Sequence, residues 1–331
     1  MPPTPTRPTY LRVVVTPRCS LACSYCHREG DAASAQPATL SLPELRALCA
    51  VGLRQGVRKL KMLGGEPLLR RDLPELIADL RARDPGLDLS LITAGAVDPQ
   101  AVDRCVAAGL SRANLSIHGF GEAAFQARTG AGARAFGLRA ATLARLLVHG
   151  RFLKLNFVWR GPQDDADLGE LLAWAAGEDV VVGVLDDLTD PTLGPDAVLA
   201  AVVRQRGRPG LLRTEPDPHS LPTTRARWAD GLEVEIKSER LGARAPWAAC
   251  GACPVRAQCR EGILALRLTH EGRLQPCLDR ADLGVDLRGP LRAGGEAAAE
   301  AVWADAVARW TGAAAGVPAG RAAGRADGVA A

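Results

Sequence analysis

The chain has 331 residues, of which 47% are hydrophobic and 24% charged, with a formal net charge of +4 at pH 7. This composition is typical of a globular protein with one large domain or two ordinary ones, and it excludes collagen-like, coiled-coil and wholly disordered chains. The basic residues form no block, and no apolar stretch reaches the roughly 18 residues of a membrane span. We therefore expect no nucleic-acid partner and no membrane anchor, and the lack of a signal-peptide pattern indicates a cytoplasmic protein.

Six short apolar runs, separated by amphipathic segments, occupy the first 190 residues. We predict that each run is a β-strand: Tyr10–Val15, Lys59–Leu63, Asp88–Thr93, Ala113–Ile117, Phe152–Val158 and Val180–Leu185. Two of the helices predicted between them begin with a capping-box pattern, Ser41 to Glu44 and Asp72 to Glu75, with proline in the first turn. Apolar residues at helical spacing predict three further helices, over Asp98–Leu110, Ala135–His149 and Asp164–Ala176.

This alternation of strands and helices predicts the fold. It is typical of right-handed βαβ units that build a parallel sheet. Six units are too few to close an eight-stranded barrel, so we predict an α/β fold, a partial (βα)6 TIM-like barrel. The active site of such a fold lies at the C-terminal ends of its strands.

Composition divides the rest of the chain. The core barrel is assigned to residues 1–190, and the segment 191–246, rich in Pro, Arg and Gly, is predicted to be an irregular connection with one strand at Leu232–Lys237. Residues 247–311 form a small cysteine-rich module that ends in a helix over Glu296–Trp310. The Ala- and Gly-rich tail, residues 312–331, is expected to be disordered.

The first cysteine cluster, Cys19, Cys23 and Cys26, directly follows the first predicted strand. Cytosolic thiols stay reduced, so clustered cysteines indicate a metal or iron–sulfur site. Three thiolates can hold three irons of a [4Fe–4S] cluster and leave the fourth iron open. A structural zinc site fits less well, because zinc takes four tetrahedral ligands and would need His27 as well. The isolated Cys49 and Cys105 are predicted to be small core residues of helices.

The run Cys19-Ser-Leu-Ala-Cys23-Ser-Tyr-Cys26 resembles the cysteine motif of the radical S-adenosylmethionine (SAM) superfamily. Gly64-Gly65-Glu66-Pro67, after the second strand, resembles that family's SAM-binding segment, in which glycines allow a close backbone approach. The resemblance implies that the open iron binds the amino and carboxylate groups of SAM. It implies that the reduced cluster cleaves SAM to a 5′-deoxyadenosyl radical, which takes a hydrogen from a small-molecule substrate. A reducing partner such as flavodoxin or ferredoxin would supply the electron.

Further segments resemble the GTP 3′,8-cyclase branch of this superfamily, which acts in molybdenum-cofactor biosynthesis. They include Tyr10-Leu-Arg12, Glu66-Pro-Leu-Leu-Arg-Arg-Asp72, Thr93-Ala-Gly95, Leu115-Ser-Ile117, Lys154-Leu-Asn156 and Arg267-Leu-Thr269. The resemblance implies SAM contacts for Tyr25, Gly64, Gly65, Glu66, Thr93 and Ser116. It implies substrate contacts for Arg12, Lys61, Lys154 and Arg267, and cations that converge from separate strands suit an anionic group, most simply phosphate. His118, at the end of the fourth strand, is a possible pocket residue.

The second cysteine cluster comprises Cys250, Cys253, Cys259 and Cys277, and it resembles the auxiliary-cluster modules called SPASM or twitch domains. Four thiolates suffice to ligate every iron of a second [4Fe–4S] cluster. Three ligands and one bystander would leave an iron open, and a structural zinc site is a further alternative. The position where either related pattern has another cysteine is Ile263 here.

Three departures from the cyclase pattern bear on the substrate. Ile92 replaces a threonine expected to contact the nucleotide, Ala265 replaces an arginine, and the chain ends in ADGVAA rather than Gly-Gly. Each removes a polar contact that a buried nucleotide would need. The sequence therefore favours a radical SAM enzyme of a biosynthetic pathway that acts on another anionic, nucleotide-like small molecule. The alternatives are the GTP 3′,8-cyclase activity itself, a peptide-modifying maturase, and a zinc-ribbon binding protein without catalysis.

Overall fold

The computed structural model describes residues 8–26, 39–149, 152–187, 190, 192–215, 223–237, 247–254, 256, 259 and 265–312. In these ranges a 12-stranded sheet has the order β12-β11-β10-β1-β2-β3-β4-β5-β6-β9-β8-β7. The strands in the first half of the chain are β1 (Tyr10–Thr16), β2 (Lys59–Gly64), β3 (Asp88–Thr93), β4 (Arg112–Ile117), β5 (Leu153–Trp159) and β6 (Val181–Asp186). The later strands are β7 (Leu211–Glu215), β8 (Thr223–Arg227), β9 (Glu233–Lys237), β10 (Leu266–Leu268), β11 (Arg273–Gln275) and β12 (Val285–Asp286).

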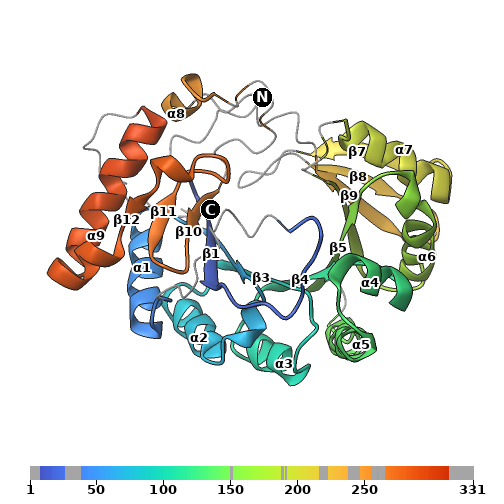
Figure 1. The fold of residues 1–331 in the computed structure, drawn as a ribbon, viewed down its shortest axis with the longest axis horizontal. Helices are drawn as coiled ribbons and strands as arrows, with labels where there is room; N and C mark the ends of the chain where they lie inside the picture. Colours follow the sequence, from blue (N-terminus) through green and yellow to red (C-terminus); the bar gives the residue numbers. More distant parts are fainter. Residues whose placement is uncertain are drawn as a thin grey trace, which may run out of the picture.

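Helices cover the outer side of this curved sheet (Figure 1). They are α1 (Leu42–Arg54), α2 (Leu73–Arg83), α3 (Gln100–Ala107), α4 (Glu122–Thr129), α5 (Ala133–Leu147), α6 (Asp165–Ala175), α7 (Pro195–Arg206), α8 (Ala248–Gly251) and α9 (Arg288–Thr311). Short 3-10 helices lie at Pro67–Leu69, Pro162–Asp164 and Ala281–Leu283. Within the described ranges, every helix is too short or too polar to cross a bilayer.

The predicted partial barrel is confirmed, since each of the six predicted strands matches β1 to β6 within one residue at either end. Two later strands extend the parallel sheet: β10 pairs with β1, and β9 pairs with β6, both in parallel. Antiparallel strands continue both edges, β11 and β12 on one side and β8 and β7 on the other. The sheet stays open, because its outermost strands β12 and β7 do not pair with each other.

Two local predictions need correction. The capping box at Ser41 is present, but Asp72 makes no side-chain cap. Its carboxylate instead accepts from Arg70 at 2.7 Å, and Arg70 also donates to the carbonyl oxygens of Val15 and Leu40. The prediction of an irregular segment over 191–246 is wrong for its described part, which contains α7, β7, β8 and β9. The strand expected at Leu232–Lys237 is β9.

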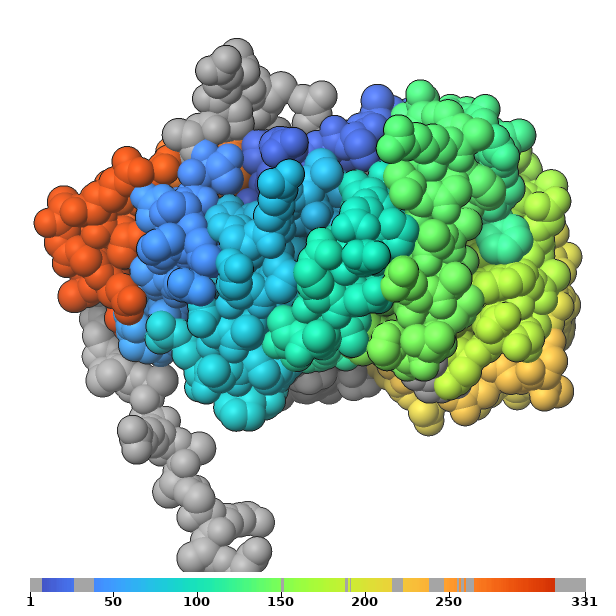
Figure 2. Space-filling model, turned by 90° about the horizontal axis from the view of Figure 1, so that it is seen from below, coloured from blue at the N-terminus to red at the C-terminus, as the bar shows by residue number. Residues whose placement is uncertain are grey.

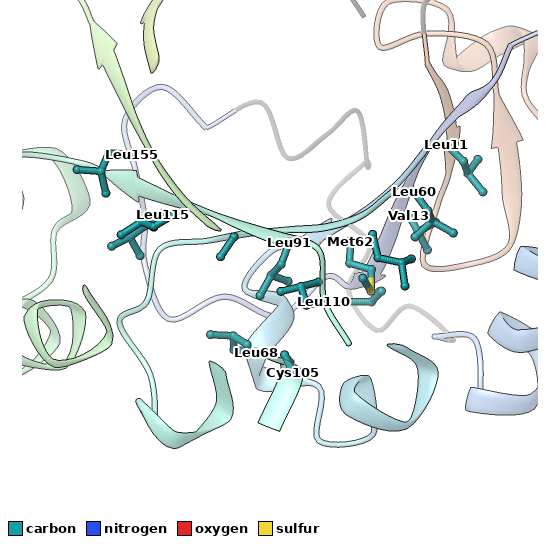
Figure 3. Close-up of a cluster of buried hydrophobic side chains, with 14 of the residues drawn as sticks. Leu11, Val13, Leu60, Met62, Leu68, Leu91, Cys105, Leu110, Leu115 and Leu155 are labelled. Carbon is teal, nitrogen blue, oxygen red and sulfur yellow. The ribbon is translucent and has the colours of Figure 1, made fainter. Parts of the chain in front are cut away.

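The hydrophobic core lies between the sheet and the helices. Figure 3 shows side chains that pack together in this layer. Of the labelled ones, Leu68 and Cys105 belong to helices and Leu110 precedes β4, and the others are alternate strand residues: Leu11, Val13, Leu60, Met62, Leu91, Leu115 and Leu155. Strand residues alternate between the two faces, so the positions between these point to the inner face. Cys49 and Cys105 are 0% and 1% exposed, which confirms their prediction as core residues.

The first long helix of the described chain, α1, lies beside the last one, α9, on the outer surface. Figure 2 shows α9 beside α1, followed by helices in chain order. Arg54 of α1 pairs with Glu296 and Glu300 of α9, each at 2.7 Å. The helix predicted over Glu296–Trp310 is the part of α9 beyond a kink at Gly295, whose φ of 70° lies in the left-handed region.

Candidate active site

The loop of the first cysteine cluster leaves β1 and is held by the end of α4. The Ala22 N–H donates to the carbonyl of Thr129 at 3.0 Å, and the Ser24 N–H donates to that of Arg128 at 3.1 Å. The last carbonyls of a helix have no partner within the helix, so they are free to accept these bonds. The sequence interpretation placed the loop correctly after β1 but did not predict α4, which holds it.

The three thiols of this loop interact with one another. Burial raises the pKa of Cys23 to about 12, and the charges of Cys26 and Cys19 act in the same direction. Thiolates that repel one another are stabilised by a bound cation, and soft thiolate donors suit iron–sulfur clusters. Among the described residues, no three His, Cys, Asp or Glu side chains converge on a point suited to one metal ion. In a [4Fe–4S] cluster each thiolate binds a different iron, so the donor set fits a cluster without such convergence.

Gly64 and Gly65 lie backbone to backbone against the start of the cysteine loop. The Gly65 N–H donates to the Thr16 carbonyl at 2.9 Å, and the Glu66 N–H donates to that of Arg18 at 2.7 Å. A Cβ on Gly64 would lie 2.3 Å from the Thr16 oxygen, and one on Gly65 would lie 2.3 Å from the Arg18 oxygen. Only glycine permits this approach, which brings the predicted SAM segment next to the predicted cluster.

The Glu66 side chain connects the ends of β2 and β3 through hydrogen bonds. It is 1% exposed, and its carboxylate accepts from the Thr93 hydroxyl at 2.7 Å and from the Ala94 N–H at 2.8 Å. Burial raises its pKa, while these hydrogen bonds act against that rise. The carboxylate and the Thr93 hydroxyl are thus bonded within the protein, and a SAM contact by either side chain stays a prediction.

Tyr25 and His118 join the cysteine loop to the end of β4. The Tyr25 hydroxyl lies 2.5 Å from His118 Nδ1, and the Cys23 sulfur lies 3.8 Å from the same nitrogen. Burial, with the charges of Arg139 and Arg128, lowers the pKa of His118 to about 4, so the ring is neutral at neutral pH. Its position after a strand suggested a pocket residue, but its two partners could not be read from the sequence. Ser116, also on β4, is half-buried.

Three of the four predicted substrate cations form a row across the inner face. Arg12 of β1 lies opposite Arg267 of β10 on one side and opposite Lys61 of β2 on the other. Register partners in a parallel sheet share a face, so the three side chains belong to one surface. Lys61 and Arg267 are only 7% and 2% exposed. Burial lowers the pKa of Lys61 well below its usual value, and the charges of Arg12 and Lys59 lower it further.

The fourth predicted cation, Lys154, is paired with a carboxylate that the sequence interpretation missed. Its ammonium group contacts Glu235 of β9, which also pairs with Arg225 at 3.0 Å. Gly183 of the intervening strand β6 leaves room for this contact, since a Cβ there would lie 2.6 Å from Lys154 Cε. Alternation along β9 could have placed Glu235 on one face, but its pairing with β6 was not predictable.

Lys237 is a further inner-face cation that the sequence interpretation missed. Burial and the nearby charge of Lys61 lower its pKa to about 8. Several buried polar atoms in this region have no hydrogen-bond partner among the described residues, among them Tyr10 Oη, Ser90 Oγ and Asn114 Oδ1. Such atoms are normally paired with protein, water or ligand, so the inner face is suited to a polar, anionic ligand.

The described residues bring two cysteines of the second cluster together. Cys277 is 7% exposed and packs against Trp247, and Cys250 lies against this pair. Cys253 and Cys259 follow in consecutive turns, with the Cys253 N–H bonded to the Cys250 carbonyl at 3.3 Å. Burial raises the pKa of Cys277 to about 11. The positions of His27 and Ile263 and the expected tail after residue 312 lie outside the described residues.

Comparison with known proteins identifies the family. The model of the radical SAM superfamily matches residues 13–175. A GTP 3′,8-cyclase of Mesorhizobium japonicum is 33% identical over 311 residues, which are 89% of this chain and 87% of the relative. The chain belongs to the radical SAM superfamily. A GTP 3′,8-cyclase of Paenarthrobacter nicotinovorans is similar too, with 32% identity over 313 residues, 85% of this chain and 81% of the relative.

A solved radical SAM structure supports the fold. Streptococcus suis SuiB bound to S-adenosylmethionine superposes with a TM-score of 0.55 over 82% of this chain, at 14% identity. The match spans 58% of the SuiB chain, and at this identity it bears on the fold alone. The family implies an enzyme that uses a [4Fe–4S] cluster, SAM and a reductant, as the cysteine motif predicted. The individual site residues and the number of clusters stay predictions.

Proposed function

We propose that this radical SAM enzyme is a GTP 3′,8-cyclase, the alternative that the sequence interpretation placed second. The observation that carries the proposal is the row of Arg267, Arg12 and Lys61 across three neighbouring strands. A triphosphate is the simplest group that neutralises buried cations of this number and placement. The similarity to GTP 3′,8-cyclases over 85–89% of this chain supports the same substrate.

The residues at the strand ends would bind the cofactors. Cys19, Cys23 and Cys26 would hold the [4Fe–4S] cluster, and the backbone of Gly64 and Gly65 would lie against SAM beside it. When bound, these groups supply reductive radical initiation, with the electron provided by a partner such as flavodoxin or ferredoxin.

The inner face would bind the substrate anion. Arg12, Lys61 and Arg267 would contact the phosphates, and Lys154 would exchange Glu235 for a phosphate oxygen. Lys237 would add a further cation. The depressed pKa values of Lys61 and Lys237 would rise on binding, because an anion removes the mutual repulsion of these ammonium groups.

The cysteine-rich module would hold a second [4Fe–4S] cluster through Cys250, Cys253, Cys259 and Cys277. The packing of Cys250 and Cys277 around Trp247 supports this, since it brings the two ends of the motif together. Arg267 lies near Cys277, whose pKa its charge lowers against the effect of burial. Arg267 would therefore connect the auxiliary site with the substrate cations.

A second candidate substrate is another anionic nucleotide. It is favoured by two apolar inner positions, the half-buried Ile92 and the 7% exposed Ala265, where the cyclase pattern has polar residues. In the cyclase pattern, the polar residues at these two positions would form hydrogen bonds with a buried nucleotide. The loss of these hydrogen bonds changes which nucleotide is preferred.

The decisive experiment uses the anaerobically reconstituted protein with SAM, dithionite and GTP. Mass spectrometry follows 5′-deoxyadenosine and any cyclised product of GTP mass, with ATP and CTP in parallel. A GTP-dependent burst of both products supports the proposal. Slow SAM cleavage that no addition of GTP accelerates rejects GTP as substrate, and acceleration by another nucleotide supports the second candidate.

A further inference from the structure

A carboxylate of the inner face contacts one of the proposed substrate cations across an intervening strand. The Lys154 ammonium group of β5 contacts Oε2 of Glu235 on β9, and β6 lies between these two strands. The residue of β6 opposite Glu235 is Gly183. A Cβ on Gly183 would lie 2.6 Å from Lys154 Cε, so a larger residue there would displace the lysine side chain. The glycine therefore permits the ion pair.

The same carboxylate has a second cationic partner on its other side. Arg225 of β8 lies opposite Glu235, and its Nη2 atom is 3.0 Å from Glu235 Oε1. Lys154 and Arg225 thus hold different oxygens of one carboxylate. The side chains of Lys154 and Glu235 are 19% and 14% exposed, whereas that of Arg225 is 42% exposed. The pair with the lysine is therefore the better shielded from solvent of the two.

The charge of Glu235 competes with any anion that binds Lys154. Burial acts to raise the pKa of Glu235, but the charges of Lys154 and Arg225 outweigh this effect and the pKa is lowered. The carboxylate is therefore ionised at neutral pH. The charge of Lys154 also acts on Lys61 and Lys237, so the lysine that Glu235 holds belongs to the cation cluster of the inner face.

Binding of an anion at Lys154 changes the partners of Glu235. A phosphate oxygen that takes the ammonium group removes one cation from a carboxylate that is mostly buried. A buried charge without a partner is unfavourable, so a second cation is needed to keep the exchange inexpensive. Arg225 already holds Oε1 and stays available, because it lies on the side of Glu235 away from Lys154.

We propose that Glu235 is an internal competitor for Lys154 that sets the affinity of the anion site, and that Arg225 is a positioning residue that keeps Glu235 paired when an anion takes Lys154. The inference rests on the proposed anion site, in which Lys154 binds a phosphate oxygen. It predicts effects of opposite sign for two neighbouring residues: loss of the Glu235 charge strengthens anion binding, and loss of the Arg225 charge weakens it.

The test is calorimetric titration of the reconstituted holoenzyme with inorganic triphosphate, without SAM or reductant. In Glu235→Gln the dissociation constant should fall about 10-fold, because the competing charge-assisted contact is lost while the shape is kept. In Arg225→Met it should rise about two- to fivefold, since a partly exposed ion pair contributes less. In the double variant the Arg225 substitution should add no weakening, because Glu235 no longer carries a charge.

Glu233→Gln is the matched control. Glu233 lies two residues before Glu235 on the same face of β9, and it pairs with Arg227 at 2.5 Å rather than with a proposed substrate cation. Its replacement should leave the dissociation constant close to that of the wild type. Equal strengthening in Glu233→Gln and Glu235→Gln would show a general effect of net charge and overturn the proposal. Unchanged affinity in Glu235→Gln, or an Arg225 effect of equal size in both backgrounds, would overturn it too.

The result does not depend on the reaction that the enzyme catalyses. A wild-type enzyme that leaves GTP unchanged but shows these shifts with triphosphate would refute the proposed function and support this inference. If neither the wild type nor Glu235→Gln binds inorganic triphosphate, this inference is overturned, whether or not GTP is converted.

Discussion

The two faces of the sheet carry opposite chemistry on the same strands. On β2, Leu60 and Met62 are 0% exposed in the core between sheet and helices, whereas Lys61 between them faces the cations of the inner side. The outer face gains stability from apolar burial. On the inner face, burial lowers the pKa of Lys61, and repulsion by the neighbouring cations lowers it further. A protein keeps such unfavourable charges where a ligand uses them, so the comparison separates stabilising residues from functional ones.

The largest effect, on both activity and iron content, is expected for the cysteines of the loop that follows β1. Cys23→Ala removes one of the three proposed cluster ligands, so we expect no detectable 5′-deoxyadenosine. With the two proposed clusters in the wild type, the iron content should fall from about eight to about four per chain. Iron analysis and mass spectrometry check both. Cys49→Ala is the control, because this cysteine lies in the core and should keep iron and activity. Residual turnover in Cys23→Ala would contradict the assignment.

On the outer face, Leu60→Ala should cost about 2–5 kcal/mol of the free energy of unfolding, because the surrounding core cannot fill the cavity. Urea denaturation measures this cost. Leu211→Ala, at a position that is 42% exposed, serves as the control and should change stability by less than about 0.5 kcal/mol. If Leu60→Ala lowers the free energy of unfolding by as little as Leu211→Ala does, the outer face is not tightly packed.

Lys61, next to Leu60 but on the inner face, should show the opposite pattern: its replacement should affect ligand binding and not stability. Lys61→Met removes a buried ammonium group but keeps an unbranched side chain, so stability should stay the same or rise. The dissociation constant for GTP should increase about 10- to 100-fold with the loss of one charge-assisted contact. Calorimetric titration and urea denaturation measure the two effects, with the exposed Arg208→Met as control. Lower stability with unchanged affinity would reverse the roles assigned to the faces.

The smallest effect concerns pH. The pKa of Lys237 is lowered to about 8, so its ammonium group is charged below pH 8 and neutral above it. Anion binding favours the charged form, and the affinity for GTP should therefore decrease as the pH rises through 8, by at most about tenfold per unit. Calorimetric titration between pH 7 and pH 9 checks this. In Lys237→Met the profile should be flatter over the same range, and identical profiles would exclude Lys237 from the site.

Much of the fold could be predicted from short segments. The six core strands follow from apolar runs, the start of α1 follows from Ser41 and Glu44, and the family follows from three cysteines and one glycine segment. The predictions that failed concern residues whose interactions depend on segments distant in the chain. Asp72 fits a capping box by pattern, but its carboxylate accepts from Arg70, whose guanidinium also donates to the distant carbonyl oxygens of Val15 and Leu40. Of the strands in 191–246, β9 pairs with β6, and β8 and β7 continue the sheet from β9. The composition of the segment does not indicate this pairing.

The strand order of the core, the cysteine loop after β1 and the family follow from the amino-acid pattern, because they depend on period, spacing and close neighbours along the chain. The pattern does not reveal that β9 and β10 join the parallel sheet, that Glu235 pairs with Lys154, or that His118 contacts Tyr25 and Cys23. Each of these contacts joins segments far apart in the chain. No local pattern encodes such a contact, since it depends on how the helices and strands pack together.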